Sequence, residues 1–340
     1  MQISKRHLAT CAAIALGWAI SSNSVAASEP PAELVEAAKA EGMLVFYSAN
    51  PVAGTEHLAE VFEEKYGITV QPLALPAGTL LQRFASELEA DSFNADIILG
   101  ATFDQVVTDD FVPKGWMVPI QEAGIPALED GSYPQEFLNK STATVAYNPW
   151  TMAYNSDLVQ GDDVPTSFEA LADPKYKDRV CIPNPEVALA YIEVWDRMRA
   201  EYGEEMLSGV AANNPKVFES AAAAASALAA GECVVAGPVS GPAIAALPGR
   251  APVVAFMPPV TTGTQMELGF INPEKIAHPN AAKLFAHYVL TPEGNEQQAT
   301  VGDNIWVLDP SKTIEEITVL QAAPDAGDRQ DKILQLLGRK

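Results

Sequence analysis

The residues best suited to hold a small molecule are hydroxyl, amide and glycine residues that follow predicted strands. Hydroxyl and amide groups donate hydrogen bonds and glycine exposes backbone N–H groups, so such loops suit an anion at a helix N-terminus. The same residue types also cap helices and form turns, and the sequence leaves both roles open. The candidate ligand-binding residues in these loops, which include one alanine and one glutamate, are Ser48, Asn50, Gly78, Thr79, Ala101, Thr102, Asn184, Glu186, Ser240, Gly241 and Thr262.

Two tryptophans add aromatic surface to this set. Trp150 and Trp306 have the flat apolar face that stacks on an organic ligand. Aromatic side chains also pack cores and hinges, and that alternative stays open for both. We include them among the candidate ligand-binding residues.

Catalytic chemistry has no support in the sequence. The chain has no nucleophile elbow, zinc-protease motif, phosphate-binding loop or dinucleotide fingerprint. His57, His278 and His287 have no visible acid or nucleophile partner, so we expect solvated or core-edge histidines. Three cysteines and four histidines in the whole chain are too few for a Cys/His zinc site. We therefore expect no enzyme activity, no metal site and no cofactor.

Strands and helices alternate along the chain. The continuous apolar run at 43–47 is typical of a parallel strand covered on both faces, and a loop and an apolar-periodic helix follow it. Residues 68–73 and 95–99 are predicted as further strands, each followed by a loop. Helices are also predicted for Pro215–Ala230 and from about Ile314 through Leu337. This alternation predicts an α/β protein with mostly parallel, doubly wound sheets. Ligands of such sheets bind beyond the carboxyl ends of the strands, which is where the candidate loops lie.

The net charge of the chain limits its partners, and the N-terminal segment indicates its cellular compartment. The 340 residues carry a formal charge of -23, which argues against nucleic acid and anionic membrane surfaces as partners. Residues 1–27 have two basic residues, a short apolar core and small residues near the end, the pattern of a secretory signal peptide. We expect cleavage near Ala26 or Ala27 and an exported protein that is not inserted in the membrane.

Cys181 and Cys233 are the cysteines that remain after cleavage. In an oxidising compartment a pair can form a disulfide, and each of the two lies in a short predicted strand. Adjacent strands only sometimes have the Cα spacing that a disulfide needs, so two buried free thiols are an equal alternative.

Six segments, in this order, resemble the extracellular solute-binding proteins of ABC importers. The resemblance extends over nearly the whole mature chain and is strongest to the branch of type II periplasmic binding proteins that contains ferric-iron, thiamine, polyamine and phosphonate binders. The segments are LVFYSAN at 44–50, FEEKYGITV at 62–70, ADIILG at 95–100, YNSDL at 154–158, PTSFEALADPKYK at 165–177 and HPNAAKLF at 278–285.

The resemblance implies two α/β lobes that are joined by crossover hinge strands and close on a ligand between them. We expect residues 28–145 and 258–300 to form the first lobe, and residues 146–257 and 301–340 to form the second. It further implies a small-molecule ligand and an ABC permease in the inner membrane as partners, and we expect a monomer. A sensor that presents its liganded form to a receptor, or an enzyme on the same fold, would be the alternatives.

The ligand class can be narrowed from the loops. Ferric binders of this branch hold iron with adjacent tyrosines in the loop after a second-lobe strand, where this chain has Gly237 to Gly241, and no Tyr-Tyr pair occurs in the sequence. Direct iron binding is therefore disfavoured, with a ferric or ferric-chelate ligand kept as the alternative. A polyamine would need acidic residues, for which Asp104 and Glu186 are candidates. The neutral donor loops favour a small polar, anionic organic solute.

Overall fold

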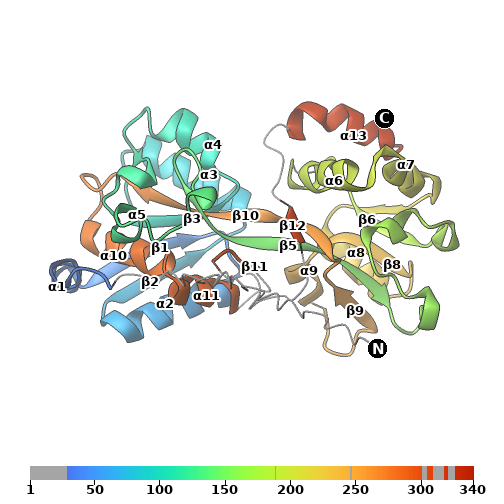
Figure 1. Ribbon diagram of the computed structural model, residues 1–340, viewed down its shortest axis with the longest axis horizontal. Coiled ribbons are helices and arrows are strands. Elements are labelled where there is room, and N and C mark those ends of the chain that lie inside the picture. The colour runs from blue at the N-terminus through green and yellow to red at the C-terminus, as the bar shows by residue number, and fades with distance from the viewer. Residues whose placement is uncertain (1–28, 188, 246, 301–304, 309–317, 321–325) are drawn as a thin grey trace, which may run out of the picture.

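Two lobes are joined by a pair of long strands in the computed structural model of the chain (Figure 1). The structure describes residues 29–187, 189–245, 247–300, 305–308, 318–320 and 326–340. The predicted signal peptide lies outside these residues. Strand β5 (Ala143–Asn155) and strand β10 (Val260–Ile271) run antiparallel to each other and cross from one lobe to the other. The expected α/β fold class with two lobes joined by crossover strands is confirmed.

The strands form one hydrogen-bonded sheet in the order β2-β1-β3-β10-β5-β8-β6-β7. Within each lobe the other strands of this path are parallel to one another, whereas β5 and β10 run against their neighbours. The carboxyl ends of β1, β2 and β3 therefore face the second lobe, and that of β8 faces the first. The remaining strands are β1 (Met43–Ser48), β2 (Thr69–Ala74), β3 (Ile97–Ala101), β4 (Met117–Val118), β6 (Val180–Pro183), β7 (Lys216–Phe218), β8 (Val235–Ser240), β9 (Val253–Phe256), β11 (Ile305–Trp306) and β12 (Thr318–Leu320).

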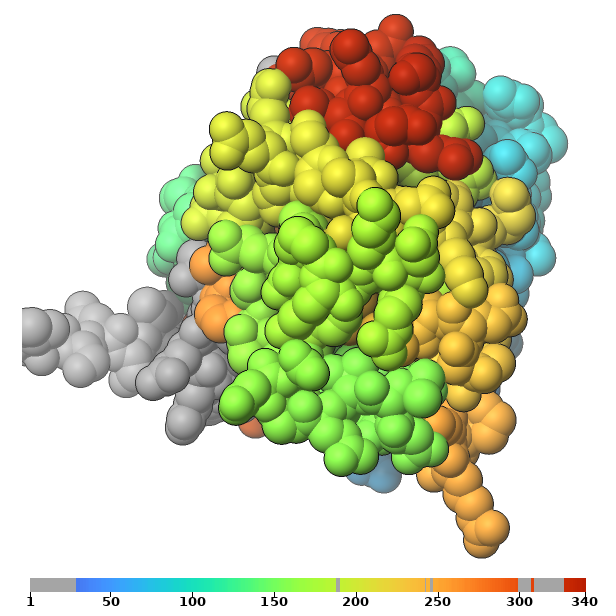
Figure 2. All heavy atoms as spheres, turned by 90° about the vertical axis from the view of Figure 1, so that its right-hand side faces the viewer, coloured from blue at the N-terminus to red at the C-terminus, as the bar shows by residue number. Residues whose placement is uncertain are grey.

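Helices cover both faces of the sheet in each lobe (Figure 1). In the first lobe they are α1 (Ala32–Glu41), α2 (Val52–Tyr66), α3 (Ala77–Glu89), α4 (Asp104–Val106), α5 (Pro126–Glu129), α10 (Pro279–Val289) and α11 (Pro292–Thr300). In the second lobe they are α6 (Leu189–Tyr202), α7 (Glu204–Ala212), α8 (Ala221–Ala229), α9 (Gly241–Ala245) and α13 (Gln330–Leu336). Seen from its outer end, the second lobe has the C-terminal segment across its top (Figure 2).

Aromatic packing dominates the core of the first lobe. The rings of Phe46 on β1 and Phe285 on α10 lie 4.8 Å apart, and Phe62 on α2 meets Phe285 at 5.0 Å. All three side chains are fully buried. Tilted and edge-on contacts of this kind add to the hydrophobic gain of burying large rings. They fix α2 and α10 on the same face of the sheet.

The second lobe has its own core, with a disulfide beside it. Trp195 of α6 is fully buried, and Cys181 on β6 is bonded to Cys233, which lies just before β8. Because β6 and β8 are neighbours, the two Cα atoms are 5.8 Å apart, within the usual range for a disulfide. The structure thus settles the alternative that the sequence left open in favour of the disulfide.

Two predicted helices are wrong in part. The Pro215–Ala230 segment begins with strand β7, and α8 starts only after Ser220, whose hydroxyl oxygen accepts a hydrogen bond from the Ala223 N–H. In the predicted C-terminal helix, Thr318–Leu320 form strand β12 on the edge of β10, and α13 covers only Gln330–Leu336. β-Branched residues at 317–319 favour a strand, and Pro324 interrupts any helix that spans this segment.

Candidate functional site

A cavity of about 380 Å³ lies between the lobes at the carboxyl ends of the strands. The first lobe contributes the loops after β1 and β2, the second lobe contributes the end of β8, and the crossing strand β5 contributes one residue. The residues that line the cavity are Ala49, Asn50, Pro51, Val52, Ala74, Leu75, Pro76, Asn148 and Ser240. Of the predicted ligand-binding residues, the cavity thus brings together Asn50 and Ser240.

Two helices begin at this cavity. Pro51 is the N-cap of the 15-residue α2 and Pro76 is the N-cap of the 13-residue α3, and both prolines line the cavity. Neither helix has a side-chain cap among the described residues, and the first intrahelical bonds go from Thr55 N–H to Pro51 and from Leu80 N–H to Pro76. The preceding N–H groups of each first turn therefore have no helical acceptor. Their partial positive charge favours an anion.

Ser48 and Asn50 shape the loop that enters α2. Ser48 is fully buried, and its Oγ accepts a 3.1 Å hydrogen bond from the Asn50 N–H. The Asn50 side chain donates from Nδ2 to Oε1 of Gln298 on α11, at 2.7 Å. The Thr55 hydroxyl donates to the Asn50 carbonyl oxygen. Ser48 thus holds the turn, while Asn50 is fixed at the cavity wall.

Four other predicted first-lobe residues, Gly78, Thr79, Ala101 and Thr102, do not line the cavity. Gly78 and Thr79 are exposed in the first turn of α3, whose N-cap is Pro76. Ala101 ends β3, where it pairs with Met266 of β10. Thr102 has a positive φ of 48° and donates its N–H to the Gln265 carbonyl oxygen.

In the second lobe, Asn184 and Glu186 are engaged with each other and with the C-terminus. The Asn184 Oδ1 accepts from the Glu186 N–H at 3.1 Å, and the Glu186 carboxylate lies 3.4 Å from Arg339 Nε. Gly241 opens the short helix α9 directly after Ser240. None of these three lines the cavity.

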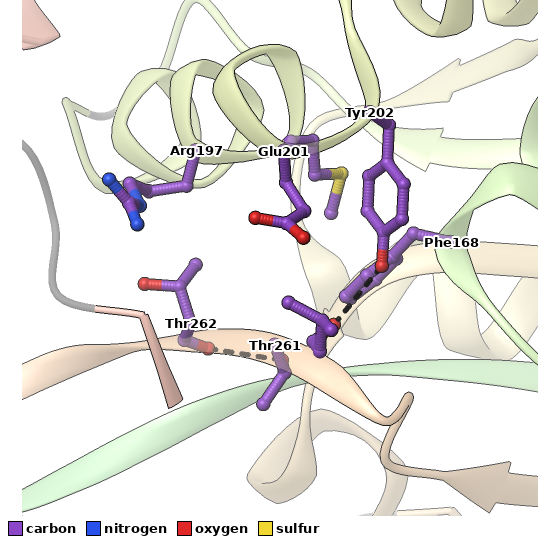
Figure 3. A pocket seen from close by; sticks show the side chains of 8 residues that line it. Phe168, Arg197, Glu201, Tyr202, Thr261 and Thr262 are labelled. Atoms are coloured by element: carbon purple, nitrogen blue, oxygen red, sulfur yellow. Dashed lines mark hydrogen bonds between the residues drawn. The ribbon is translucent and has the colours of Figure 1, made fainter. Parts of the chain in front are cut away.

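Trp150 and Thr262 lie on the crossing strands, outside the cavity lining. Trp150 is 7% exposed and packs on Tyr191 of α6 with ring centres 5.3 Å apart. Thr262 borders a separate void of about 10 Å³ under α6, which Arg197 and Glu201 also line (Figure 3). That void has room for about one water molecule. The side chain of Trp306 lies outside the described residues.

One of the crossing strands carries a buried carboxylate. Glu267 on β10 is 2% exposed, and its Oε2 accepts hydrogen bonds from the N–H groups of Phe103 and Asp104 at 2.6 and 2.7 Å. Burial raises the pKa of Glu267 to about 7, against those two hydrogen bonds and with help from the charges of Asp104 and Glu193. Burial also raises the pKa of Glu193 on α6.

Among the described residues, no three His, Cys, Asp or Glu side chains are grouped so that they could hold a metal ion. In the same part of the chain, no helix is long and apolar enough to span a membrane.

Sequence reasoning missed Asn148, Pro51 and Pro76 as cavity residues. Asn148 and Pro149 interrupt the pattern of the sequence here, so the pattern does not reveal the single strand β5 that continues through both residues. Pro51 and Pro76 could have been identified from the sequence, because a proline directly before a helix leaves the first turn without a side-chain cap and so with free backbone N–H groups.

Comparison with solved structures places this geometry in a known fold. The substrate-binding protein of an ABC transporter from Agrobacterium tumefaciens superposes with a TM-score of 0.65 at 15% identity, covering 87% of this chain and 94% of that one. Iron-bound HitA from Pseudomonas aeruginosa gives 0.58 at 17% identity, covering 87% and 98%. AfuA from Actinobacillus pleuropneumoniae, with fructose-6-phosphate bound, gives 0.58 at 18% identity, covering 88% and 97%.

No curated protein matches the chain. The family model described as bacterial extracellular solute-binding protein matches residues 43–300, which is more than half of the sequence and includes every residue that lines the cavity. The chain belongs to the bacterial extracellular solute-binding proteins, with the type II periplasmic binding fold of ABC-transporter substrate-binding proteins.

Proposed function

We propose that the protein captures a small polar, anionic organic solute in the cavity between its lobes and delivers it unchanged to an ABC permease. The observation that carries this proposal is the start of two uncapped helices, α2 and α3, at one cavity. Both present backbone N–H groups and the positive ends of their dipoles. A cavity of about 380 Å³ is within the usual size range for small-molecule sites.

The polar groups of the lining support the same ligand class. Asn50, Asn148 and Ser240 are neutral, and the described lining contains no acidic or basic side chain. An anion thus meets hydrogen-bond donors without a carboxylate that would repel it. A polyamine would meet no acidic partner there.

Ferric iron, the alternative ligand, finds less support. Hard Fe(III) prefers phenolate and carboxylate oxygens. The described lining has neither, and the loop after β8 presents Ser240 and Gly241. Iron-bound HitA shares the fold, but at 17% identity that likeness does not carry its ligand to this chain.

The remaining expectations belong to the same proposal. The protein is exported by its signal peptide, acts in the periplasm as a monomer and meets the permease in the inner membrane. The lobes correspond to residues 28–145 with 258–300 and residues 146–257 with 301–340. Asn50 and Ser240 contact the solute, with Gly78, Thr79 and Thr102 at the rim.

Thermal-shift screening of the mature protein against organic anions, amines and ferric salts tests the ligand class. A ligand at 100 times its Kd stabilises the native state by about 2.7 kcal/mol, which gives a measurable rise in Tm. We expect shifts with organic anions. Shifts with amines alone, or with ferric salts alone, would contradict the proposal, as would chemical conversion of the bound solute.

Two variants locate the site. Asn50→Ala and Ser240→Ala should each weaken binding of the best anion by at least about tenfold, because each removes a hydrogen-bonding group from the cavity wall. Asn94→Ala and Ser86→Ala are matched controls at exposed positions outside the cavity. If both cavity variants keep full affinity in calorimetric titration, the site lies elsewhere.

A further inference from the structure

The wall of the cavity between the lobes is largely apolar. Six of the nine lining residues are apolar, and all six come from the first lobe, where β1 leads into α2 and β2 leads into α3. They are Ala49, Pro51, Val52, Ala74, Leu75 and Pro76. A solute that is polar throughout gains nothing from such a wall, whereas a hydrocarbon group gains free energy by leaving water for it.

Val52 is the most accessible part of this wall. It is 57% exposed, more than any other large hydrophobic side chain in the described part of the chain. It is the first residue of α2, directly after the N-cap Pro51. One exposed valine on a convex surface would need no explanation. Because Val52 lines a cavity of about 380 Å³, its exposed surface is available for a solute to cover.

The backbone behind the apolar wall is held in place. The Leu75 N–H donates a 3.1 Å hydrogen bond to the Ser48 carbonyl oxygen, and the Ala49 N–H donates a 2.8 Å hydrogen bond to the Leu99 carbonyl oxygen. These two bonds tie the loops after β1 and β2 to the sheet. Leu75 also packs against the core of the first lobe. The wall is thus presented from fixed elements, as a selective site requires.

The positive charge at the cavity matches a single acid group. The described lining contains no lysine or arginine, so the starts of α2 and α3 are its sources of positive charge. Each helix N-terminus is equivalent to about half an elementary charge, and the two together offset about one negative charge. A second negative charge would have no counterpart in this lining, in a chain whose formal charge is already -23.

We propose that the solute is an amphipathic monoanion, with one acid group and a hydrocarbon body of a few carbon atoms, and that Val52 is the residue that selects the body. This deepens, and rests on, the proposed function. The acid group lies at the first turns of α2 and α3, and the hydrocarbon body is buried against Val52 and Leu75. The substrate class is then a short straight-chain or branched monocarboxylate, and dicarboxylates and doubly charged phosphate esters are discriminated against.

Matched ligands test the class. We would titrate the mature protein calorimetrically with 4-methylpentanoate, with succinate, in which a second carboxylate replaces the isopropyl group, and with 4-methylpentanamide, which has no charge. 4-Methylpentanoate should bind at least about tenfold more tightly than either. Along the series acetate, propionate, butyrate and pentanoate, each added methylene should strengthen binding by up to about fourfold until the wall is covered.

Variants of Val52 assign the preference to this side chain. Val52→Thr keeps the shape and replaces a methyl group with a hydroxyl, so the gain per added methylene should fall. Val52→Lys adds a cation at the wall, so the preference should move from 4-methylpentanoate toward succinate. Val254→Thr is the matched control, because Val254 on β9 is 41% exposed and lies outside the cavity lining. Thermal melts of the unliganded variants show which are folded, and Val52→Ala replaces any that is not.

Three results would overturn the inference and leave an anion-binding protein. They are succinate binding as tightly as 4-methylpentanoate, an affinity that does not depend on chain length, and other anions binding while every monocarboxylate fails to bind. A loss of affinity in Val52→Thr that is equal for acetate and pentanoate would overturn the role of Val52, since the side chain would then meet the second lobe and not the solute.

The failure of the proposed function has its own signature. If 4-methylpentanamide binds as tightly as 4-methylpentanoate, or if only amines or ferric salts bind, the cavity is not an anion site. The inference then fails together with the function on which it rests.

Discussion

Two buried carboxylates, one in the second lobe and one on a crossing strand, have pKa values that are shifted in opposite directions. Asp196 on α6 has a side chain that is 1% exposed, and Glu267 on the crossing strand β10 is 2% exposed. Burial raises the pKa of Asp196, but hydrogen bonds from Arg329 and Arg199 outweigh it, so the net pKa is lowered. The pKa of Glu267 is raised to about 7. Burial acts in the same direction on both groups, so the hydrogen-bonding partners of each carboxylate decide whether its net pKa is raised or lowered.

The partners differ in charge. Arg329 donates to Asp196 from Nε at 2.9 Å and from Nη2 at 2.6 Å, and Arg199 Nε adds a bond at 2.9 Å. These charge-assisted bonds favour the ionised form. Glu267 has two backbone N–H donors, no ion pair among the described residues, and acidic neighbours. The second lobe thus gains stability from an ionised carboxylate, whereas the crossing strand gains it from a protonated one.

The largest pH effect is expected at Glu267. A carboxyl whose pKa rises from 4.5 to about 7 on folding contributes stability that is fully present below pH 4.5 and is lost as the pH rises through 7. The shift corresponds to about 3 kcal/mol. Glu267→Gln should therefore be more stable than the native protein at pH 8 by up to that amount, with the difference decreasing toward pH 4.5. Urea denaturation across this range measures it, and a pH-independent difference would contradict the raised pKa.

Asp196 should show the opposite pH dependence. Its lowered pKa contributes stability that is present above pH 3.8 and is lost as the pH falls through the folded-state value. Asp196→Asn should cost about 2 kcal/mol at pH 7, since the charge-assisted bonds weaken while the two arginines stay partly hydrated. The native protein should lose this advantage on acidification. A variant as stable as the native protein at pH 7 would show that the ion pairs contribute no net stability.

The smallest effect tests the coupling between the two lobes. The charge of Glu193 on α6 is the last of the causes that raise the pKa of Glu267. Glu193→Gln should lower that pKa slightly, because this charge is the smallest of the causes, and carbon-detected NMR of labelled glutamate side chains measures the change. Glu201→Gln, on the same face of α6 and beside the void under it, is the control. Equal shifts in both variants would rule out a specific effect of Glu193.

Much of the fold could be predicted from the sequence, because burial on both faces leaves continuous apolar runs. Residues 43–47 are a run of this kind and lie in β1, and the segment 95–99, which is apolar except for Asp96, overlaps β3. The signal failed where a strand is only three residues long, as in β7 and β12, and where proline occurs inside a strand, as at Pro149 in β5. Such segments owe their conformation to a neighbouring strand, which periodicity does not report.

The candidate site could be predicted to the level of loops. The rule that ligands bind beyond strand ends identified the loops that contain Asn50 and Ser240. It did not separate a residue that faces the cavity from one that holds the turn, as Ser48 does, because both roles use the same hydroxyl. Nor did it indicate Asn148, which lines the cavity from inside strand β5 and not from a loop after a strand.

The close contact between the crossing strands at Gly263 has a consequence for how the lobes can move. Gly263 lies where β5 and β10 approach each other so closely that an added Cβ would be 2.8 Å from Tyr147 Cβ. The two strands are 13 and 12 residues long, and each is hydrogen-bonded into both halves of the sheet. Sliding would break the ladder, whereas added twist keeps it intact. When the lobes rotate by a few degrees about this contact, each atom moves in proportion to its distance from the contact. The outer surface of each lobe therefore moves the most. A membrane partner that contacts those outer surfaces would sense cavity occupancy with the greatest sensitivity.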